Sequence, residues 1–235
     1  ISSSVLFLII FVREIILGGA KTLAVFTSDA LSANKYYWPA LPWTTVVAGA
    51  AILGYQLQGI RLALLAGLGF FYVSVFGQWE PSMQTLSFIL ISAPVCFILG
   101  LSLGIWGYLS KNVEAALQPI LNVAQTLPHF SYLVPVLVMF GIGDHAGAIA
   151  TIIFATPPMV RLTILGLKKI SPDVVDSGLM SGCNKFQLMF RVLIPTARRD
   201  ILIGVNQVIM QCLAMTVIAS FIGARGLGFN LKVAL

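Results

Sequence analysis

Long apolar runs separated by short polar breaks make up most of this chain. The three longest runs cover residues 83–109, 146–167 and 201–222. Each is as long as a helix that crosses the hydrocarbon core of a bilayer, which takes about 20 residues. A fourth crossing is expected over 115–140, where a break at Leu127 and Pro128 divides two shorter helices. The pattern therefore predicts an all-α, polytopic membrane protein.

The N-terminal part of the chain has shorter apolar runs. Residues 44–57 and 62–76 are joined by a polar break that ends at Arg61, and they predict a helical hairpin whose helices are barely long enough to span. An earlier run, 5–17, predicts either the remnant of a spanning helix or an interfacial helix. Tyr and Trp side chains gather between 36 and 43, as is typical of a membrane interface.

These differences divide the chain into two regions. Residues 1–81 are expected to form N-terminal hydrophobic and interfacial helices, and residues 82–235 to form a transmembrane core. The first residue lies inside an apolar run, and Leu235 follows closely on a glycine-rich turn predicted at 223–228. We therefore expect the natural protein to be longer at both ends.

Two glycines in the first long run have a spacing that matters for packing. Gly100 and Gly104 lie four residues apart, on one face of the predicted helix. Small residues at this spacing let two membrane helices approach closely. The pair predicts a close helix contact at this face.

The longest polar stretch of the core begins near residue 171. Ser171 suits a helix N-cap, Pro172 suits the first helical position, and Asp173 places negative charge in the first turn. A short helix is therefore predicted to begin here.

The same stretch carries signals for a corner and a second helix. Gly178 and Gly182 are expected to weaken and end the first helix, because glycine is a poor helix former. A second short helix is predicted over 185–192, ending near Pro195. Together these elements predict two short helices at a membrane surface, between two spanning helices.

The distribution of charge indicates an orientation in the membrane. The chain has a net charge of +6, yet charged residues make up only 9% of it, against about 25% in soluble domains. The basic residues gather in loops, which indicates membrane topology and not nucleic-acid binding. The positive-inside rule places residues 168–199 in the cytoplasm, together with Lys111 and Arg61. The outer side then receives Glu80, Asp144, Lys21 and Lys35.

The sequence carries no pattern typical of an enzyme active site or a cofactor site. Residues 18–22 end in Lys-Thr, like a phosphate-binding loop, but Ala20 occupies a position that requires glycine. His129 lies beside a helix break and His145 in a turn, where packing or capping roles are expected. The three cysteines, Cys96, Cys183 and Cys212, show no pairing or metal-binding spacing and are interpreted as free thiols. We expect no catalytic residue, metal or cofactor in this chain.

Few polar side chains lie inside the predicted spans. Arg161, Asn206 and Gln207 stand out, together with Gln211, and such groups either tie helices together or line a pathway. Aromatic rings offer cation–π surfaces to a passing ammonium group, although packing is their commoner role. The candidate substrate-pathway residues are therefore Trp106, Phe130, Tyr132, Arg161, Asn206 and Gln207.

The polar stretch resembles the cytoplasmic signature loop of ABC importer permeases. Asp176 stands where that family has Glu, and Ser177 and Gly178 stand where it has two alanines. Gly182 matches the glycine of the signature, and Ile194 with Pro195 matches its closing Leu-Pro. The resemblance implies that residues 168–199 form a coupling loop, which docks through these six residues onto an ATPase subunit.

Other runs narrow the resemblance to one subfamily. Several runs are similar to permeases of glycine betaine and proline betaine importers: 125–128, 132–135, 140–143, 151–155, 157–158, 161–166, 204–207 and 217–220. The resemblance covers residues 82–228. It implies a type I importer with a five-helix permease core, of which four helices are visible here and the last would follow Leu235. The N-terminal hydrophobic helices are additional to that core.

The same resemblance implies function and partners. We expect a permease subunit in a bacterial inner membrane that imports betaine-like osmolytes, including sulfonium and N-oxide analogues, by alternating access. The implied partners are an ATPase subunit that binds ATP and Mg²⁺, an extracytoplasmic binding protein, a second permease copy in a homodimer, and membrane lipid. Two alternatives remain: the same machine with choline, an amino acid or a sulfonate as cargo, and an ion-coupled carrier or channel.

Overall fold

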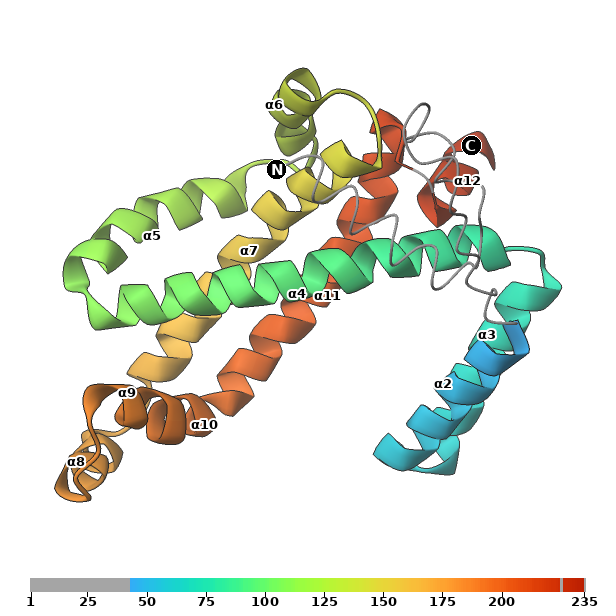
Figure 1. Cartoon of the computed structure of the whole chain (residues 1–235). Coiled ribbons are helices and arrows are strands. Elements are labelled where there is room, and N and C mark those ends of the chain that lie inside the picture. The colour runs from blue at the N-terminus through green and yellow to red at the C-terminus, as the bar shows by residue number, and fades with distance from the viewer. Residues whose placement is uncertain (1–42, 225, 235) are drawn as a thin grey trace, which may run out of the picture.

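The computed structural model describes residues 43–224 and 226–234, most of which are helical (Figure 1). The expectations for the run 5–17, for Ala20, Lys21 and Lys35, and for the aromatic cluster before Trp43 fall outside these residues. Helices α2 (Trp43–Gln58) and α3 (Ile60–Val75) form the predicted hairpin and have 16 residues each. Gly59 joins them with a φ of 78°, a left-handed backbone conformation that favours glycine.

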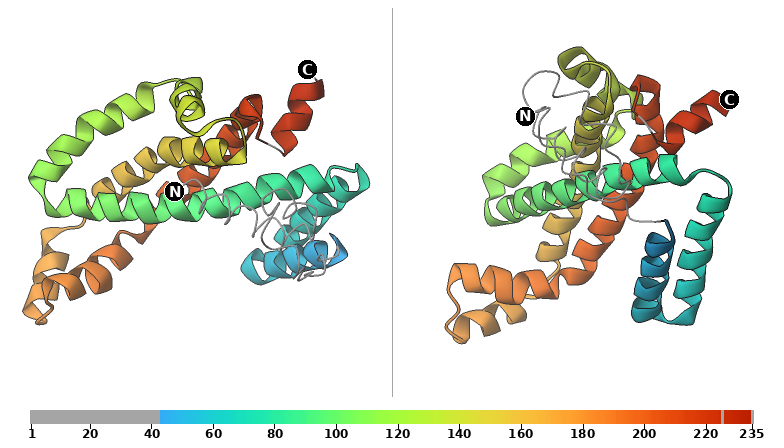
Figure 2. Two further views of the ribbon diagram at one scale, coloured as in Figure 1. Left: turned by 45° about the horizontal axis from the view of Figure 1, so that its top comes forward. Right: turned by 45° about the vertical axis from the view of Figure 1, so that its right-hand side comes forward.

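Three long helices form the core of the molecule: α4 (Trp79–Leu109), α7 (Asp144–Lys168) and α11 (Arg198–Ala219). Helix α7 packs against both α4 and α11 (Figures 1 and 2). Within the apolar segment of membrane length, 67% of α7 is buried inside the molecule, against 33% for each of the other two. Helix α7 is therefore the central helix.

The contact between α4 and α7 depends on the predicted pair of glycines. A Cβ atom on Gly100 would lie 2.5 Å from Cβ of Met159, and one on Gly104 would lie 2.5 Å from Cβ of Thr163. Met159 and Thr163 are fully buried. The close helix approach predicted from the glycine spacing is confirmed.

The fourth predicted crossing has a different shape from the one expected. Helix α5 (Lys111–Thr126) and helix α6 (Phe130–Phe140) are inclined to each other by 102°, so together they form a broken span or a re-entrant element. Leu127 is extended, as the residue before a proline tends to be, and it ends α5. Helix α5 also begins at Lys111, before the start at 115 that the sequence predicts. Only Ser110, whose backbone is extended, separates it from α4.

The C-terminal helices adjust two further predictions. A short 3-10 segment, η3 (Ser220–Ile222), completes the predicted run at 201–222. The turn expected over 223–228 is shorter, because α12 (Leu227–Ala234) begins at Leu227. The backbone N–H of Leu227 donates a hydrogen bond of 3.0 Å to Thr85 Oγ1, which ties α12 to the start of α4.

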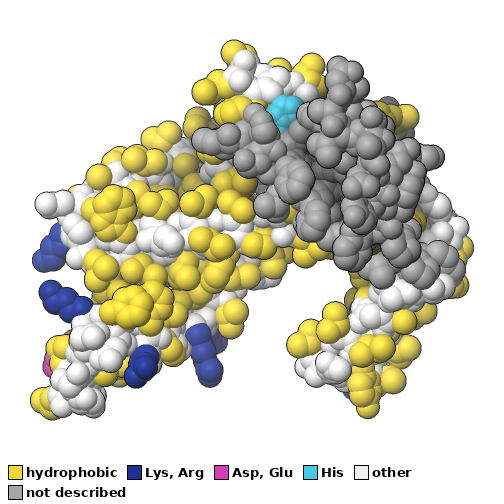
Figure 3. All heavy atoms as spheres, viewed as in Figure 1, with side chains coloured by type: hydrophobic (Ala, Val, Ile, Leu, Met, Phe, Trp, Pro, Cys, Tyr) yellow, Lys and Arg dark blue, Asp and Glu magenta, His cyan; other side chains and the backbone are white. Residues whose placement is uncertain are grey.

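Apolar and basic side chains occupy different parts of the surface, as is expected of a membrane protein. In the view of Figure 3, hydrophobic side chains cover the long face of the molecule, and Lys and Arg side chains gather at the end that carries α8 and α9. Three described helices are long and apolar enough to cross a membrane, or four if the bent pair counts as one span. The chain is thus an all-helical membrane protein.

Candidate coupling surface and membrane pocket

The polar stretch folds into two helical segments, the first of which is α8 (Pro172–Met180). It begins where the sequence predicts, with Ser171 at the N-cap position, Pro172 first and Asp173 in the first turn. The Ser171 side chain makes no capping hydrogen bond. Within the helix, the Ser177 hydroxyl donates a hydrogen bond of 2.7 Å to the carbonyl of Asp173, one turn earlier.

The end of α8 is made by one of the two glycines and not by both. Gly182 has a φ of 79°, and its N–H donates to Leu179 O at 3.0 Å. The next N–H, of Cys183, donates to Gly178 O at 3.2 Å. These two bonds form a Schellman motif, in which a left-handed glycine closes the helix. Gly182 therefore ends α8, as predicted.

Gly178 has a different role from the one predicted. It lies inside α8 and is buried, and the helix continues past it. A Cβ atom at Gly178 would lie 2.6 Å from Leu188 Cδ1, so the missing side chain lets α8 pack against the following segment. The expectation that Gly178 ends the helix was wrong, because tertiary packing outweighs its low helix propensity.

The second helical segment also runs further than predicted. It consists of α9 (Lys185–Gln187), the π-helical segment η2 (Leu188–Leu193) and α10 (Ile194–Thr196). Asn184 and Gln187 form a capping box, with side chain to backbone bonds of 2.8 and 3.0 Å. The segment extends past the predicted bound at 192 and ends at Thr196, next to Pro195, near which the sequence predicts its end. Pro195 itself lies in the first turn of α10, where proline is tolerated.

The six residues of the predicted coupling signature occupy two places on this loop. Asp176, Ser177 and Gly182 are exposed on α8 and its C-terminal corner, and Gly178 is buried beneath them. Ile194 and Pro195 lie at the other end of the loop, next to α11. An open hollow of about 400 Å³ lies between α8 and η2, lined in part by Asp173, Ser177, Gly178, Cys183 and Val192.

Large apolar side chains are exposed on this otherwise polar loop. Met180 is 89% exposed and Phe186 is 70% exposed. The ring of Phe190 lies 4.5 Å from that of Phe186, measured between centroids. Exposed apolar side chains with a polar rim are typical of surfaces that bind another protein.

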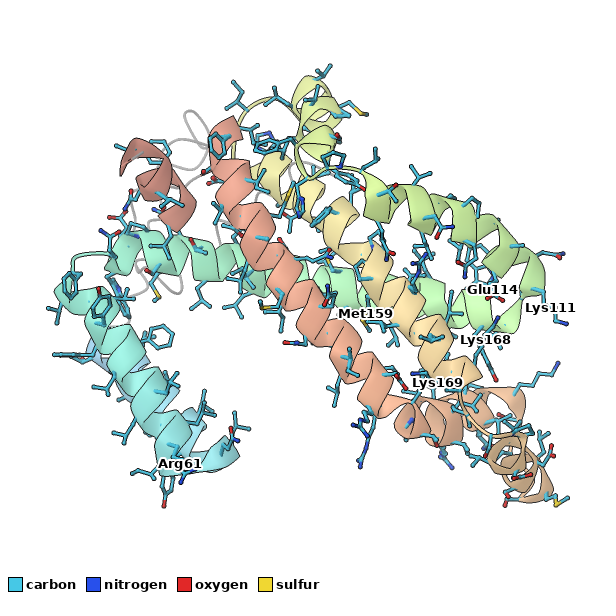
Figure 4. The ribbon with its side chains drawn as sticks, turned by 180° about the vertical axis from the view of Figure 1, so that it is seen from behind. Arg61, Lys111, Glu114, Met159, Lys168 and Lys169 are labelled. Carbon is cyan, nitrogen blue, oxygen red and sulfur yellow. The ribbon has the colours of Figure 1, made fainter. Side chains whose placement is uncertain are left out.

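Two ion pairs connect the end of α7 to its neighbours. Lys168 Nζ lies 2.5 and 2.7 Å from the carboxylate oxygens of Glu114 on α5 (Figure 4). Lys169 Nζ lies 2.9 Å from Asp200 Oδ1 on α11. Adjacent residues at one helix end are thus joined to two different helices.

A second site, the membrane pocket, lies between α5, α7 and α11. Its volume is about 400 Å³, and it is lined by Ala124, Gln125, His129, Phe154, Pro158, Arg161, Leu162, Gln207 and Gln211. Phe154, Pro158 and Arg161 recur at intervals of four and three residues, which places them on one face of α7. Gln207 and Gln211 are likewise four residues apart on α11. The opposite face of α7 carries Met159 and Thr163, which pack against α4.

The contacts within the pocket separate a polar part from an aromatic part. The Arg161 guanidinium donates a hydrogen bond to Asn122 Oδ1 on α5. The rings of His129 and Phe154 lie 4.4 Å apart, and Tyr132 contacts the same Phe154 ring edge-on at 5.4 Å. The Tyr132 hydroxyl donates to the carbonyl of Ala124, which joins α6 to α5 across their bend.

The structure brings together only part of the predicted pathway set. Arg161 and Gln207 line the membrane pocket, and Tyr132 lies behind its aromatic wall. Trp106 is 59% exposed on α4, and Phe130 is exposed and stacks edge-on against Phe221. Asn206 is exposed on α11, and none of these last three residues lines the pocket.

Sequence reasoning missed several pocket residues. His129 was expected to pack, and it does contact Phe154, but it also faces the pocket. Phe154 and Gln125 were not predicted as substrate-pathway residues. The helical spacing of Phe154, Pro158 and Arg161 was a usable signal, since it puts an aromatic and a cation on one face. His145 has the expected capping role, with Nε2 2.7 Å from Phe140 O.

Comparison with known proteins identifies similar sequences over the whole chain. Residues 97–235 match the family described as the inner membrane component of binding-protein-dependent transport systems. The chain is 59% identical over 237 aligned positions to the trimethylamine N-oxide transport system permease protein TmoV of Pelagibacter ubique, covering all of this chain and 33% of that protein. It is 36% identical to the glycine betaine transport system permease protein OpuAB of Bacillus subtilis, covering 90% of this chain and 73% of that protein. The chain thus spans about a third of the length of the first relative.

Solved structures agree on the fold. An inward-facing form of the MetNI methionine ABC transporter matches with a TM-score of 0.58 at 22% identity, covering 69% of this chain and 80% of that one. An amino acid ABC transporter crystallised with histidines matches with a TM-score of 0.56 at 18% identity, covering 73% of this chain and 81% of that one.

Proposed function

This chain belongs to the family of inner membrane components of binding-protein-dependent transport systems, and from that membership we propose that it forms the permease of an ATP-driven importer of betaine-like osmolytes. The cargo class comprises glycine betaine, proline betaine and their sulfonium and N-oxide analogues. The observation that carries the proposal is the 59% identity, along the whole chain, to a permease named for trimethylamine N-oxide. Relatives named for glycine betaine support the same class.

The 168–199 loop is proposed to dock onto a partner ATPase. The exposed Met180 and Phe186 supply apolar anchors, and the Schellman corner at Gly182 fixes the position of Met180 relative to the second segment. In typical complexes a few well-packed side chains near the centre of the interface carry most of the binding energy. ATP and Mg²⁺ would be bound by the ATPase. The 168–199 loop of this chain would transmit the motion of the ATPase to the membrane helices.

Transport is proposed to follow alternating access. Closure of the ATPase subunits on ATP would push the 168–199 loop, and the helices that continue from it, α7 and α11, would carry the motion to the membrane pocket. A binding protein would deliver cargo from outside, and a second permease copy would form the other half of the pathway. We propose that the cargo passes through the pocket between α5, α7 and α11 on its way across the membrane.

The cargo assignment is tested by reconstitution. The full-length permease, its ATPase and its binding protein are placed in liposomes, and ATP-driven uptake of labelled trimethylamine N-oxide is measured. Glycine betaine and a sulfonium analogue are added in excess as competitors, with an ordinary amino acid as the control. Competition by the methylated compounds alone is expected. Competition by the amino acid alone would leave the family membership standing and contradict the betaine-like cargo.

A further inference from the structure

We propose that the membrane pocket is a specificity filter, which accepts a small methylated ligand only if that ligand carries an anionic oxygen. Methylated cations without such an oxygen, of which choline is the test case, would be rejected. The inference rests on the proposed function, because it refines the cargo of the same permease. It assigns the discrimination to Arg161 and to the amides around it.

The charge of the pocket is the first observation. Arg161 is the one permanently charged side chain among the nine that line the pocket, and the lining includes no carboxylate. Among the described residues its side chain has one hydrogen-bond partner, the neutral Asn122, and no ion-pair partner. The described carboxylates lie at helix ends or in loops: Glu80, Glu114, Asp144, Asp173, Asp176 and Asp200. Within residues 43–224 and 226–234, the positive charge of the pocket is therefore uncompensated.

The depth of that charge makes it effective. Arg161 lies seven residues before Lys168, which places its Cα about 10 Å from the end of α7. The residue is partly buried, and charges interact more strongly where water is partly excluded. An anionic oxygen is attracted to such a site, whereas an ammonium group is repelled unless an anion accompanies it.

The amides provide further groups for an oxygen ligand. Gln125, Gln207 and Gln211 line the pocket from α5 and α11. Among the described residues the buried Oε1 of Gln211 has no hydrogen-bond partner. The N–H₂ group of the same amide is a hydrogen-bond donor, so Gln211 is able to offer a donor to an oxygen ligand in the pocket. An anionic oxygen accepts such a bond, and a bare trimethylammonium group does not.

The aromatic part of the pocket suits the other end of the ligand. His129 and Phe154 lie with ring centroids 4.4 Å apart. Phe154 is two helical turns from Arg161 on the same face of α7, so the aromatic and cationic groups face one cavity from different depths. Aromatic faces favour methylated ammonium groups through cation–π attraction. They do so for zwitterions and cations alike, so the aromatic part alone would not discriminate between them.

Specificity then follows from one attractive and one repulsive contribution. Arg161 stabilises the oxygen of a zwitterion or an N-oxide and opposes a ligand whose net charge is positive. Hydrogen bonds to charged groups are worth about 1.5–3 kcal/mol, which corresponds to a preference of about tenfold to a hundredfold.

The test measures binding to the permease without the binding protein. The full-length permease and its ATPase are placed in nanodiscs, and the binding of trimethylamine N-oxide and of choline is followed separately by saturation-transfer NMR. Wild type is expected to bind the N-oxide at least tenfold more tightly than choline. Arg161→Gln is expected to weaken N-oxide binding about tenfold or more and to leave choline binding unchanged or stronger. Lys111→Gln removes a cation outside the pocket and should change neither.

A second variant keeps the filter testable even if Arg161→Gln fails to fold. Gln207 is exposed to the pocket, and Gln207→Glu is nearly isosteric but adds a carboxylate. It is expected to shift the preference toward choline by at least tenfold. The filter is overturned if wild type shows no N-oxide binding, binds both ligands equally, or keeps its preference in both variants. Uptake of the N-oxide by the complete transporter is measured in parallel, and its absence would contradict the proposed function and not the filter.

Discussion

Met159 of α7 fills the space that a side chain on Gly100 of α4 would need. A Cβ atom at Gly100 would lie 2.5 Å from both Cβ and Cγ of Met159. The same methionine reaches α11, where its Sδ would lie 2.7 Å from a Cβ on Gly204. Met159 is therefore the side chain at which all three long helices meet (Figure 4).

Substitution of Gly100 should destabilise this junction. Gly100→Ala forces an added methyl group against the stem of a fully buried side chain, and overpacking of this kind costs about 1–3 kcal/mol. The midpoint of thermal unfolding in detergent is expected to fall. Gly69→Ala is the matched control, since a Cβ atom at Gly69 of α3 has nothing within 4 Å. Equal midpoints for the two variants would contradict the packing argument.

Gly182 should tolerate asparagine better than valine. Its φ of 79° is costly for residues with a Cβ atom, by about 1–2 kcal/mol, whereas Asn adopts this conformation more readily. Nothing lies within 4 Å of a Cβ at this position, so the effect is one of backbone and not of space. Gly182→Val is expected to reduce cargo-stimulated ATP hydrolysis and copurification of the ATPase, and Gly182→Asn to retain most of both. Normal coupling in the valine variant would exclude a role for this corner.

Phe186 should act as an apolar anchor for the ATPase. Phe186→Asp places a charge on a side chain that is 70% exposed, so folding should be unaffected while docking is weakened by about 1–3 kcal/mol or more. Phe186→Leu keeps an apolar group and serves as the control. The amount of ATPase that copurifies with each variant is the measurement. Equal recovery in both variants would place the interface elsewhere.

The topology is open to a labelling experiment. Cysteines are introduced singly at Met180 and Ile142, which are 89% and 74% exposed, in a background where Cys96, Cys183 and Cys212 are replaced by alanine. The Lys and Arg asymmetry places residue 180 in the cytoplasm and residue 142 outside. An impermeant thiol reagent added to intact cells should label position 142 and spare position 180. The opposite result would invert the orientation.

The sequence predicted the parts of this structure that local chemistry controls. The apolar runs predicted α4, α7 and α11, and the spacing of Gly100 and Gly104 predicted the close contact with α7. Pro172 and Asp173 predicted the start of α8. In each case neighbouring residues in the chain carry the signal, so tertiary contacts were not needed.

The errors occurred where distant residues decide the outcome. Gly178 was expected to end a helix, but its contact with Leu188 makes it part of the packing between α8 and η2. The 102° bend between α5 and α6 leaves no signature beyond the break at Pro128. The membrane pocket joins residues from α5, α7 and α11, and no pattern within one helix shows which faces meet.

The two ion pairs at the end of α7 have a mechanical consequence. Lys168 holds α5 through Glu114, and Lys169 holds α11 through Asp200. Helices α5 and α11 are also two of the three walls of the membrane pocket. A displacement of the end of α7 by the 168–199 loop would therefore move α5 and α11 together. The width of the pocket would then change with the position of the loop.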